Sequence, residues 1–368
     1  MTLIERETFP RHKLCGEFIS PECLSHFADL GVLDQMLAAG GTRIAETRFY
    51  TPGGRNFSVS SGTFQGLGFA LGLSRAAMDE RLLRQAATVG VNVCEDSNVT
   101  AVTAENGRIA GLTLRRGNGK TFDVQADLYV DASGRARVLS KLLSKNRTDR
   151  DGRAAFNKSL FVGFKSHLKG AAAAKGTCEL YLFPGGYGGL SPVEVGLTNH
   201  CFMVKSSIAR EFGGDADKIV ENVVKRNNRA AETLSNAEPV QEWLAVSVAG
   251  FGKAEPGSAA NLLAVGDSAA FIDPFTGSGM LMAFESAAVL AESIDQYHHM
   301  LEAVPDLYRF EYDRKFARRL RICSALRRAA FLPLVPAFAM SFLSISGRGR
   351  AFLADATRSP KIRWPINR

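Results

Sequence analysis

The sequence is poor in the residues that build metal sites and disulfides. Its 368 residues include only six cysteines and six histidines, and no two cysteines are spaced as a C-x-x-C pair or as metal ligands. We therefore expect reduced thiols, no metal centre and a cytoplasmic protein. The opening residues MTLIERE carry charge where a secretory signal would be apolar, so we expect no such signal.

Net charge is also lacking over most of the chain. The formal charge is +8, and residues 301–368 alone hold 14 Lys or Arg against 5 Asp or Glu. Basic residues interleaved with aromatic ones through a folded module are typical of nucleic-acid binding. This pattern is not seen, so we expect no nucleic-acid partner and predict a basic helical region over residues 301–368.

The basic region contains an uncharged run, residues 329–347, that is near membrane-spanning length. Pro333 and Pro336 interrupt it, and serines dilute it, which disfavours a transmembrane span. Two interpretations stay open. The region is either a helical cap over the rest of the fold or a peripheral contact on the inner surface of a membrane.

A glycine-rich phosphate turn is missing at the start of the chain. Residues Thr2 to Ile4 are predicted to form a buried strand that ends on Glu5. A carboxylate at such a strand end normally binds an adenosine ribose about 20 residues after a G-x-G-x-x-G turn. The only other glycine cluster, residues 184–189, opens no apolar helix. We therefore expect a further βα segment of roughly 30 residues ahead of Met1.

The strongest motif that is present is NLLAVGDSAAFIDPFTGSGM. Its strand ends at Gly266, which allows close backbone approach to a ligand, and places Asp267 where a carboxylate can bind sugar-alcohol hydroxyls. The turn from Gly277 to Gly279 then opens a long apolar helix. Free amides and the positive helix end at that turn favour an anion or an electron-rich ring edge.

Two weaker motifs carry charge beside glycine. In LYVDASGRARVLSK, Asp131 follows an apolar strand, and either a pyrophosphate or nicotinamide contact or a plain strand terminus fits it. In RHKLCGEFISPE, the charged residues Arg11, Lys13 and Glu17 flank Cys15 and Gly16. Cys15 is a weak candidate for a reactive thiol, because a lone thiol more often serves packing.

Together ERETFPRHKLCGEFISPE, GLSRAAMDERLLRQA, DLYVDASGRARVLSK and AVGDSAAFIDPFTGSGM resemble one family. They are similar to the FAD-dependent oxidoreductases related to geranylgeranyl reductases. That group itself resembles the para-hydroxybenzoate hydroxylase class of flavin monooxygenases and the flavin halogenases. The Trp-containing motif and active-site lysine of tryptophan halogenases are not evident, which argues against halogenation.

The resemblance implies an FAD site. Glu5 would hold the adenosine ribose, Val99 would lie by the adenine, Asp267 would bind the ribityl chain, and the turn at Gly277 would face the pyrimidine end of the flavin. The full set of expected cofactor-binding residues is Glu5, Arg11, Lys13, Cys15, Gly16, Arg75, Val99, Asp131, Gly266, Asp267, Pro274, Gly277, Ser278 and Gly279.

The resemblance also implies an α/β fold with a Rossmann-like FAD-binding domain of the glutathione reductase type and an inserted β-rich substrate domain. We expect the FAD-binding domain at residues 1–42, 69–154 and 255–300, and the substrate domain at 43–68 and 155–254. From the spacing of apolar residues, helices are predicted at residues 21–31 and 73–89, a strand in SLFVGFKSHL, and one long helix from about Ala216 to Ala231.

The expected function is an FAD-dependent oxidation or reduction of an apolar organic substrate, with NAD(P)H as an electron donor. Reduction of a carbon–carbon double bond in an isoprenoid-like substrate and hydroxylation of an aromatic or polyketide-like ring through a C4a hydroperoxide both stay open. The competing hypothesis is a truncated, non-catalytic remnant that cannot hold FAD alone. The sequence does not indicate the oligomeric state.

Overall fold

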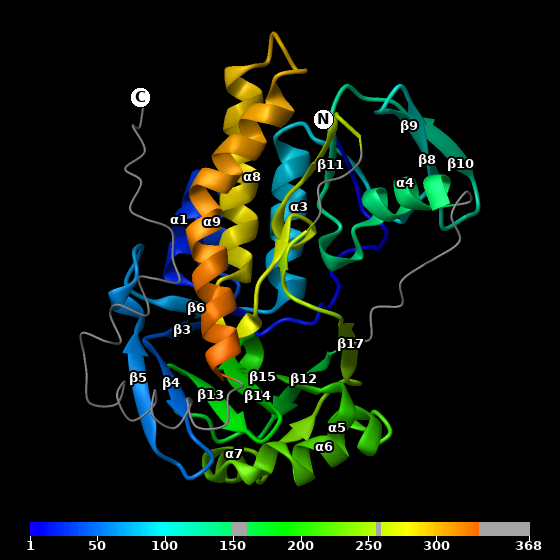
Figure 1. The fold of residues 1–368 in the computed structure, drawn as a ribbon. Coiled ribbons are helices and arrows are strands. Elements are labelled where there is room, and N and C mark those ends of the chain that lie inside the picture. The colour runs from blue at the N-terminus through cyan, green and yellow to red at the C-terminus, as the bar shows by residue number, and fades with distance from the viewer. Residues whose placement is uncertain (149–159, 255–258, 331–368) are drawn as a thin grey trace.

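The computed structural model describes residues 1–148, 160–254 and 259–330, and its largest element is an eight-stranded mixed sheet (Figure 1). The strand order is β16-β12-β15-β14-β13-β4-β5, and β17 pairs with β12 as well. Neighbours are antiparallel except β4 and β13, which run parallel. The strands are β4 (Glu46–Tyr50), β5 (Asn56–Ser60), β12 (Phe161–Lys169), β13 (Thr177–Phe183), β14 (Gly186–Pro192), β15 (Thr198–Lys205), β16 (Glu238–Pro239) and β17 (Leu244–Val248).

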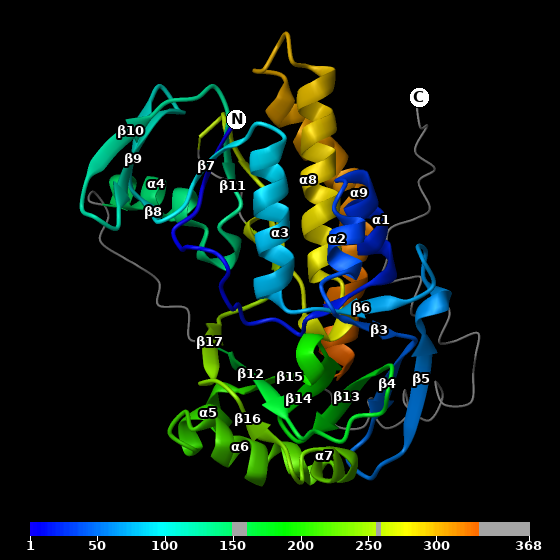
Figure 2. The same ribbon diagram turned by 180° about the vertical axis from the view of Figure 1, so that it is seen from behind.

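Three short helices cover one face of this sheet (Figures 1 and 2). They are α5 (Ser206–Glu211), α6 (Ala216–Asn222) and α7 (Asn228–Thr233). The prediction of one helix from Ala216 to Ala231 is therefore wrong. The backbone leaves the helical region at Val223 and again at Asn227, and the Asn227 side chain caps α7 by accepting hydrogen bonds from the amides of Arg229 and Ala230.

The other half of the molecule contains two separate pairs of parallel strands. In the first, β1 (Thr2–Ile4) pairs with β7 (Asn92–Cys94). In the second, β11 (Tyr129–Asp131) pairs with β19 (Leu262–Ala264). A three-stranded antiparallel sheet with α4 (Val138–Thr148) packs beside them. Its strands are β8 (Ser97–Glu105), β9 (Arg108–Arg116) and β10 (Thr121–Val124).

Small sheets and long helices join the two halves. The small strands are β2 (Phe18–Ile19), β3 (Thr42–Ile44), β6 (Ala70–Gly72), β18 (Gly252–Lys253) and β20 (Ala270–Phe271). The helices are α1 (Pro21–Asp29), α2 (Leu33–Leu37), α3 (Arg75–Thr88), α8 (Gly279–Gln296) and α9 (Val304–Ala330). Both views show α3, α8 and α9 standing on the side of the large sheet opposite α5–α7 (Figures 1 and 2). The predicted α/β fold class is confirmed, as are the predicted helices at α1, α3 and α8.

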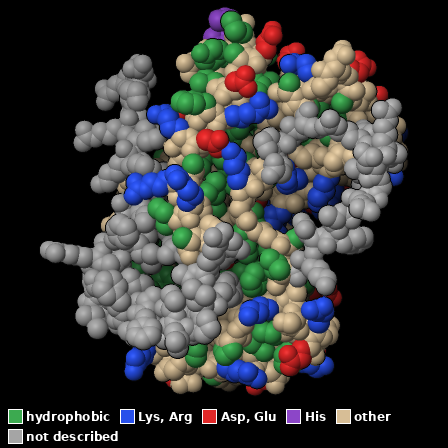
Figure 3. Space-filling model, in the orientation of Figure 1, with side chains coloured by type: hydrophobic (Ala, Val, Ile, Leu, Met, Phe, Trp, Pro, Cys, Tyr) green, Lys and Arg blue, Asp and Glu red, His purple; other side chains and the backbone are tan. Residues whose placement is uncertain are grey.

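The C-terminal helix α9 turns one of its arginines inward. Val304, Tyr308, Tyr312 and Phe316 form a buried stripe against α8, and Arg319 continues that stripe with 2% exposure. The predicted basic helical region thus contains one basic side chain that is buried. On the face drawn in Figure 3, Lys and Arg side chains are interspersed with hydrophobic and acidic ones.

The uncharged run predicted at residues 329–347 lies almost wholly outside the described residues. Among the helices that the structure does describe, none combines the length and the apolar character needed to cross a bilayer.

Candidate active site

The glycine turn before α8 has the geometry of a ligand-binding helix start. Gly277 adopts a left-handed φ of 60°, which glycine tolerates without strain. A side chain at Gly279 would meet no atom within 4 Å, so the space before the first turn is open. The Ser278 side chain makes no cap hydrogen bond to the helix. The first amides of α8 can therefore receive an electron-rich group.

Asp267 lies close by, at the end of β19. Gly266 precedes it with a left-handed φ of 56°, and the Gly266 amide donates to Ser286 Oγ at 2.9 Å, which fixes the strand end against α8. The Asp267 carboxylate has no hydrogen-bond partner in the described part of the chain. Burial raises the pKa of Asp267 to about 6, although Arg135 and Arg75 oppose the shift. A buried carboxylate without donors is a ready acceptor for ligand hydroxyls.

The 11–17 loop and the start of α3 approach the same place. Arg75, the first residue of α3, forms a two-point ion pair with Asp79 at 2.9 Å. Lys13 reaches the same carboxylate at 2.6 Å. Burial lowers the pKa of Lys13, while Asp79 opposes the change. The predicted residues Lys13, Cys15, Gly16 and Arg75 are thus brought together beside Asp267.

Arg11 and Glu5 form the outer end of this region. The Arg11 guanidinium approaches Glu5 Oε1 at 3.4 Å, and its buried Nε has no partner in the described structure. Val99 on β8 and Ile4 on β1, the residue before Glu5, pack against the same hydrophobic cluster. The predicted adenosine-binding residues are therefore neighbours, and one orphaned donor points to a missing acceptor.

Protein donors reach both carboxylate oxygens of Asp131. Its Oδ1 accepts from the Ser133 amide, the Ser133 hydroxyl and the Ser268 hydroxyl. Its Oδ2 accepts from the Leu139 amide at 3.1 Å. These bonds hold the 131–139 turn against the Gly266–Ser268 turn, so Asp131 positions the site. Its contact with a pyrophosphate or nicotinamide group stays a prediction.

Glu17 lies in the predicted charged loop, but the sequence alone did not indicate a role for it in the site. Its side chain is fully buried, and Oε1 accepts from Lys165 Nζ at 3.0 Å and from the Arg75 amide at 2.9 Å. Oε2 lies 2.6 Å from His167 Nε2. Burial by itself would raise the pKa of Glu17, but His167 and Lys165 hold it below its usual value. Lys165 and His167, two basic residues on a strand predicted to be apolar, were the signal in the sequence that could have indicated a buried acidic partner.

One face of the eight-stranded sheet is open toward these groups. Side chains alternate along a strand, and Tyr181 and Phe183 of β13 are buried under α5–α7. Their neighbours Leu180 and Leu182 are only half-buried on the opposite face. The other half-buried residues of this open face are Phe49, Tyr187, Gly189 and Cys201. The open face is mostly apolar, with Lys165 at one side.

Tyr187 ties the open face to the glycine turn. Its hydroxyl donates to Asp273 Oδ1 at 2.5 Å and accepts from the Phe275 amide at 3.0 Å. Burial, with the Asp273 charge, raises the pKa of Tyr187 well above its ordinary value. The Phe275 ring packs edge-on against Tyr187 and contacts Phe49. The sheet and the turn before α8 therefore share one aromatic wall, formed by Phe49, Phe57, Tyr187 and Phe275.

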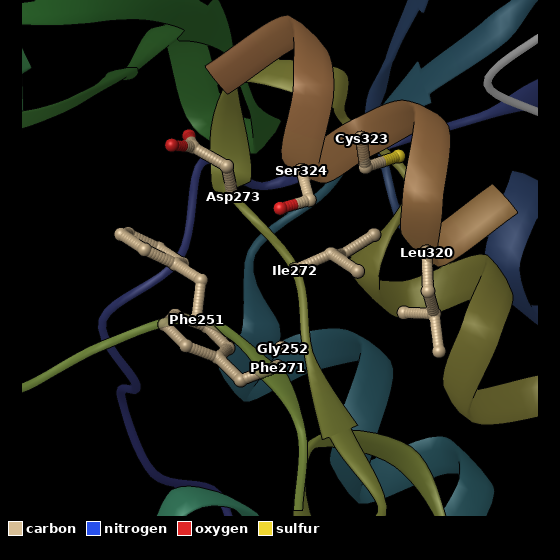
Figure 4. Close-up of a pocket in the computed structure, with 8 residues that line it drawn as sticks. All are labelled: Phe251, Gly252, Phe271, Ile272, Asp273, Leu320, Cys323 and Ser324. Atoms are coloured by element: carbon tan, nitrogen blue, oxygen red, sulfur yellow. The ribbon is translucent and has the colours of Figure 1, made fainter. Parts of the chain in front are cut away.

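A small pocket lies behind this wall, between the β18–β20 strands and α9 (Figure 4). Figure 4 shows Phe251 and Ile272 on the strand side and Leu320 and Cys323 on the helix side. Its volume of about 20 Å³ suffices for one water molecule. It is too small for an organic substrate.

Comparison with known proteins agrees with this geometry. Residues 39–167 match the family model described as tryptophan halogenase. Digeranylgeranylglycerophospholipid reductase 2 of Methanopyrus kandleri is 25% identical over 84% of this chain and 76% of its own length. Conditioned medium factor receptor 1 of Dictyostelium discoideum is 24% identical over 96% of this chain and 70% of its own. The solved structure of the flavin-dependent brominase Bmp2 superposes with a TM-score of 0.78, at 19% identity, over 96% of this chain and 86% of that one.

The fold is shared with solved structures of flavin-dependent enzymes. In sequence the chain is similar to the FAD-dependent oxidoreductases that include the geranylgeranyl reductases and the flavin-dependent halogenases, and this similarity supports an FAD-dependent enzyme. The predicted resemblance is thereby confirmed.

Proposed function

We propose that this protein binds FAD between the glycine turn and the 11–17 loop and reduces a carbon–carbon double bond of an apolar, isoprenoid-like substrate. The observation that carries the proposal is the partnerless Asp267 carboxylate beside the open start of α8, at the edge of an apolar sheet face. The digeranylgeranylglycerophospholipid reductase of M. kandleri, whose name states a reduction of this class, supports it over 84% of this chain.

The residues present fit FAD. Asp267 would accept ribityl hydroxyls, and the amides at Gly277–Gly279 would face the pyrimidine end of the flavin. Glu5 and the orphaned Arg11 Nε would bind at the adenosine end. Bound FAD supplies hydride transfer or oxygen activation. The protein supplies position, a dry apolar face and the positive N-terminal end of α8 near the ring, and NAD(P)H is proposed as the electron donor.

The proposed domain division follows the sheets. The substrate domain, residues 43–68 and 155–254, would contain the eight-stranded sheet, and its open face would hold the substrate against the flavin. Phe49, Phe57, Tyr187 and Phe275 would line the apolar end of that face. The proposal also includes peripheral membrane contact through the basic C-terminal region, residues 301–368.

The two parallel strand pairs support a further strand between them. Backbone pairing occupies one edge of β1 and one edge of β11, and the N-terminal end of β1 lies beside β11 in both views (Figures 1 and 2). Val130 of β11 is 41% exposed, which is unusual for a parallel strand. We propose that the strand of the predicted βα segment fills this gap and carries the turn for the pyrophosphate.

The first experiment measures flavin binding by the 368-residue chain and by a chain extended with the residues encoded directly upstream. Flavin absorption that survives gel filtration, together with quenched flavin fluorescence, is expected at least for the extended chain. If neither chain retains FAD, the truncated-remnant hypothesis replaces this proposal.

The second experiment separates reduction from oxygen-dependent hydroxylation. The FAD-loaded protein is reduced under nitrogen and mixed with a short polyprenyl compound, and the product is examined by mass spectrometry. A mass gain of two hydrogens without oxygen supports the proposal. A product that requires air and gains one oxygen atom would instead assign the protein to the monooxygenases.

A further inference from the structure

The buried Glu17 cluster has features that a purely structural ion pair does not need. Lys165 is fully buried, yet Glu17 Oε1 is its only acceptor in the described part of the chain. An ammonium group has three N–H donors, so two of them lack a protein partner there. A buried cation is costly unless it is fully hydrogen-bonded. This arrangement therefore points to a further hydrogen-bond acceptor, outside the described protein groups, beside Lys165.

The register of the sheet gives the direction in which Lys165 points. Lys165 of β12 pairs with Cys201 of β15, and Cys201 is half-buried on the open face. Asn199, two residues before Cys201, donates to the Cys15 carbonyl at 3.0 Å, while its buried Oδ1 has no partner in the described structure. The inner end of the cluster therefore borders both the 11–17 loop and the open face.

The outer end of the cluster is in contact with solvent. His167 keeps 4% exposure, and only its Nε2, which faces Glu17, has a hydrogen-bond partner in the described structure. The exposed His12 lies edge-on to the His167 ring at 5.3 Å. Exposure thus falls from His12 through His167 to Glu17 and Lys165. The remaining polar or titratable groups that face the cluster are Cys15, Arg75, Ser191, Glu194, Asn199 and Cys201.

We propose that His167, Glu17 and Lys165 form a proton relay from solvent to the open sheet face. The relay rests on the proposed function, because saturating a double bond adds one hydride and one proton to the substrate. Reduced flavin is the hydride source. Lys165 gives the proton as its N–H bond breaks and a C–H or bridging-water O–H bond forms. Glu17 returns to Lys165 a proton received from His167 Nε2, and His167 takes a new proton from water at Nδ1.

The first test needs no flavin. In the flavin-free protein, the proton on His167 Nε2 should give a downfield imidazole resonance, because the bond to a carboxylate is 2.6 Å long. This resonance should vanish in His167→Ala, shift upfield in Glu17→Gln, and exchange with water in a saturation-transfer experiment. A resonance that Glu17→Gln leaves unchanged, or that does not exchange with water, would overturn the relay.

The second test follows proton delivery in the FAD-loaded protein. When dithionite-reduced protein meets oxygen, two electrons pass to O₂, which takes up two protons to give H₂O₂. His167→Ala should slow this reoxidation by about 100-fold, and added imidazole should restore most of the rate. His298→Ala is the matched control, because His298 is an exposed histidine beyond α8, and its rate should equal that of the wild type.

The outcomes separate the relay from the proposed function. Normal FAD affinity and melting temperature in His167→Ala, with unchanged reoxidation or with no rescue by imidazole, would count against the relay alone. If no form of the chain binds FAD, the proposed function fails while the first test still decides the relay. Should His167→Ala not fold, Glu17→Gln, which keeps the shape of the side chain, replaces it in both tests.

Discussion

At the scale of the residue, the site is built from charged groups whose partners are incomplete. Asp267 has no donor, Arg11 has an orphaned nitrogen, and Lys165 has a single acceptor in the described part of the chain. Each is a cost to the folded protein. Such costs are expected where a ligand completes the hydrogen bonds, so binding and stability oppose one another at these positions.

Asp267→Asn should therefore stabilise the flavin-free protein while weakening FAD binding. Because burial raises the pKa of Asp267 from 3.8 to about 6, the folded state holds this proton more tightly than the unfolded state. The contribution of protonated Asp267 to the free energy of unfolding is therefore fully present below pH 4 and is lost as the pH rises through 6. In scanning calorimetry, Asp267→Asn should have the same melting temperature as the wild type at pH 4 and a higher melting temperature than the wild type at pH 8.

The same variant should raise the FAD dissociation constant by about 10- to 100-fold, because it loses one or two hydrogen bonds to a charged group. Fluorescence titration measures this constant. Asp306→Asn is the control, because the Asp306 side chain is 88% exposed and far along the chain from the site. If Asp267→Asn binds FAD as tightly as the wild type, the ribityl assignment is wrong.

At the scale of the element, two polar side chains join segments that hydrophobic packing alone would not align. Asn227 caps α7 and also donates from Nδ2 to the carbonyls of Tyr50, Thr51 and Leu182. Arg319 of α9 donates to Glu285 Oε2 at 2.7 Å, and its second nitrogen contacts the Ser278 carbonyl at 3.4 Å. Asn227 thus fixes α7 to the large sheet, and Arg319 fixes α9 to the glycine turn.

Asn227→Ala should lower the free energy of unfolding by about 3 kcal/mol, because it removes a cap and several buried hydrogen bonds. Asn227→Asp should be at least as harmful. It keeps the cap acceptor but turns a carboxylate toward three carbonyl oxygens. Urea unfolding followed by circular dichroism measures both. An Asp variant as stable as the wild type would show that only the cap matters.

Arg319→Met should lower the free energy of unfolding by about 3–5 kcal/mol, because it removes the buried guanidinium that donates to the Glu285 carboxylate. The double variant Arg319→Met, Glu285→Met should recover most of that loss. Denaturant unfolding of the two single variants and the double variant completes the cycle. Additive losses would show that the two side chains do not interact in solution.

The elements show which parts of the structure a sequence can predict. Strand β1, helix α3 and the turn before α8 follow from local patterns of apolar residues and glycine, and all were predicted. The burial of Arg319 was not predicted, although it continues the spacing of Tyr308, Tyr312 and Phe316, which indicates the buried face of the helix. Glu17 and Lys165 lie far apart along the chain, and no local pattern reports a contact that only the sheet creates.

At the scale of the whole molecule, function depends on how the large sheet sits against the glycine turn. Tyr187, Asp273 and Phe275 make that connection with two hydrogen bonds and one ring contact. The open face and the start of α8 belong to different parts of the sequence. Their relative position is therefore set by this small group of side chains as well as by the chain connections.

Tyr187→Phe should leave the protein folded but raise the FAD dissociation constant by about tenfold, the value of one hydrogen bond that holds the turn. Tyr181→Phe is the matched control on the other face of the same sheet, where the hydroxyl donates to Glu179. It should reduce stability without changing FAD affinity. Equal effects of the two variants on FAD affinity would refute a specific role for Tyr187.

The parallel pairing of β4 with β13 also governs the order in which the chain can fold. These strands come from segments about 130 residues apart, and such long-range contacts form slowly. During synthesis the hairpin of β4 and β5 leaves the ribosome with Phe49 and Phe57 stacked but without the sheet that receives them. Phe49 and Phe57, two residues of the aromatic wall, are thus apolar side chains that stay exposed in the nascent chain. A chaperone bound to nascent chains should therefore contact residues 46–60 until β13 has emerged.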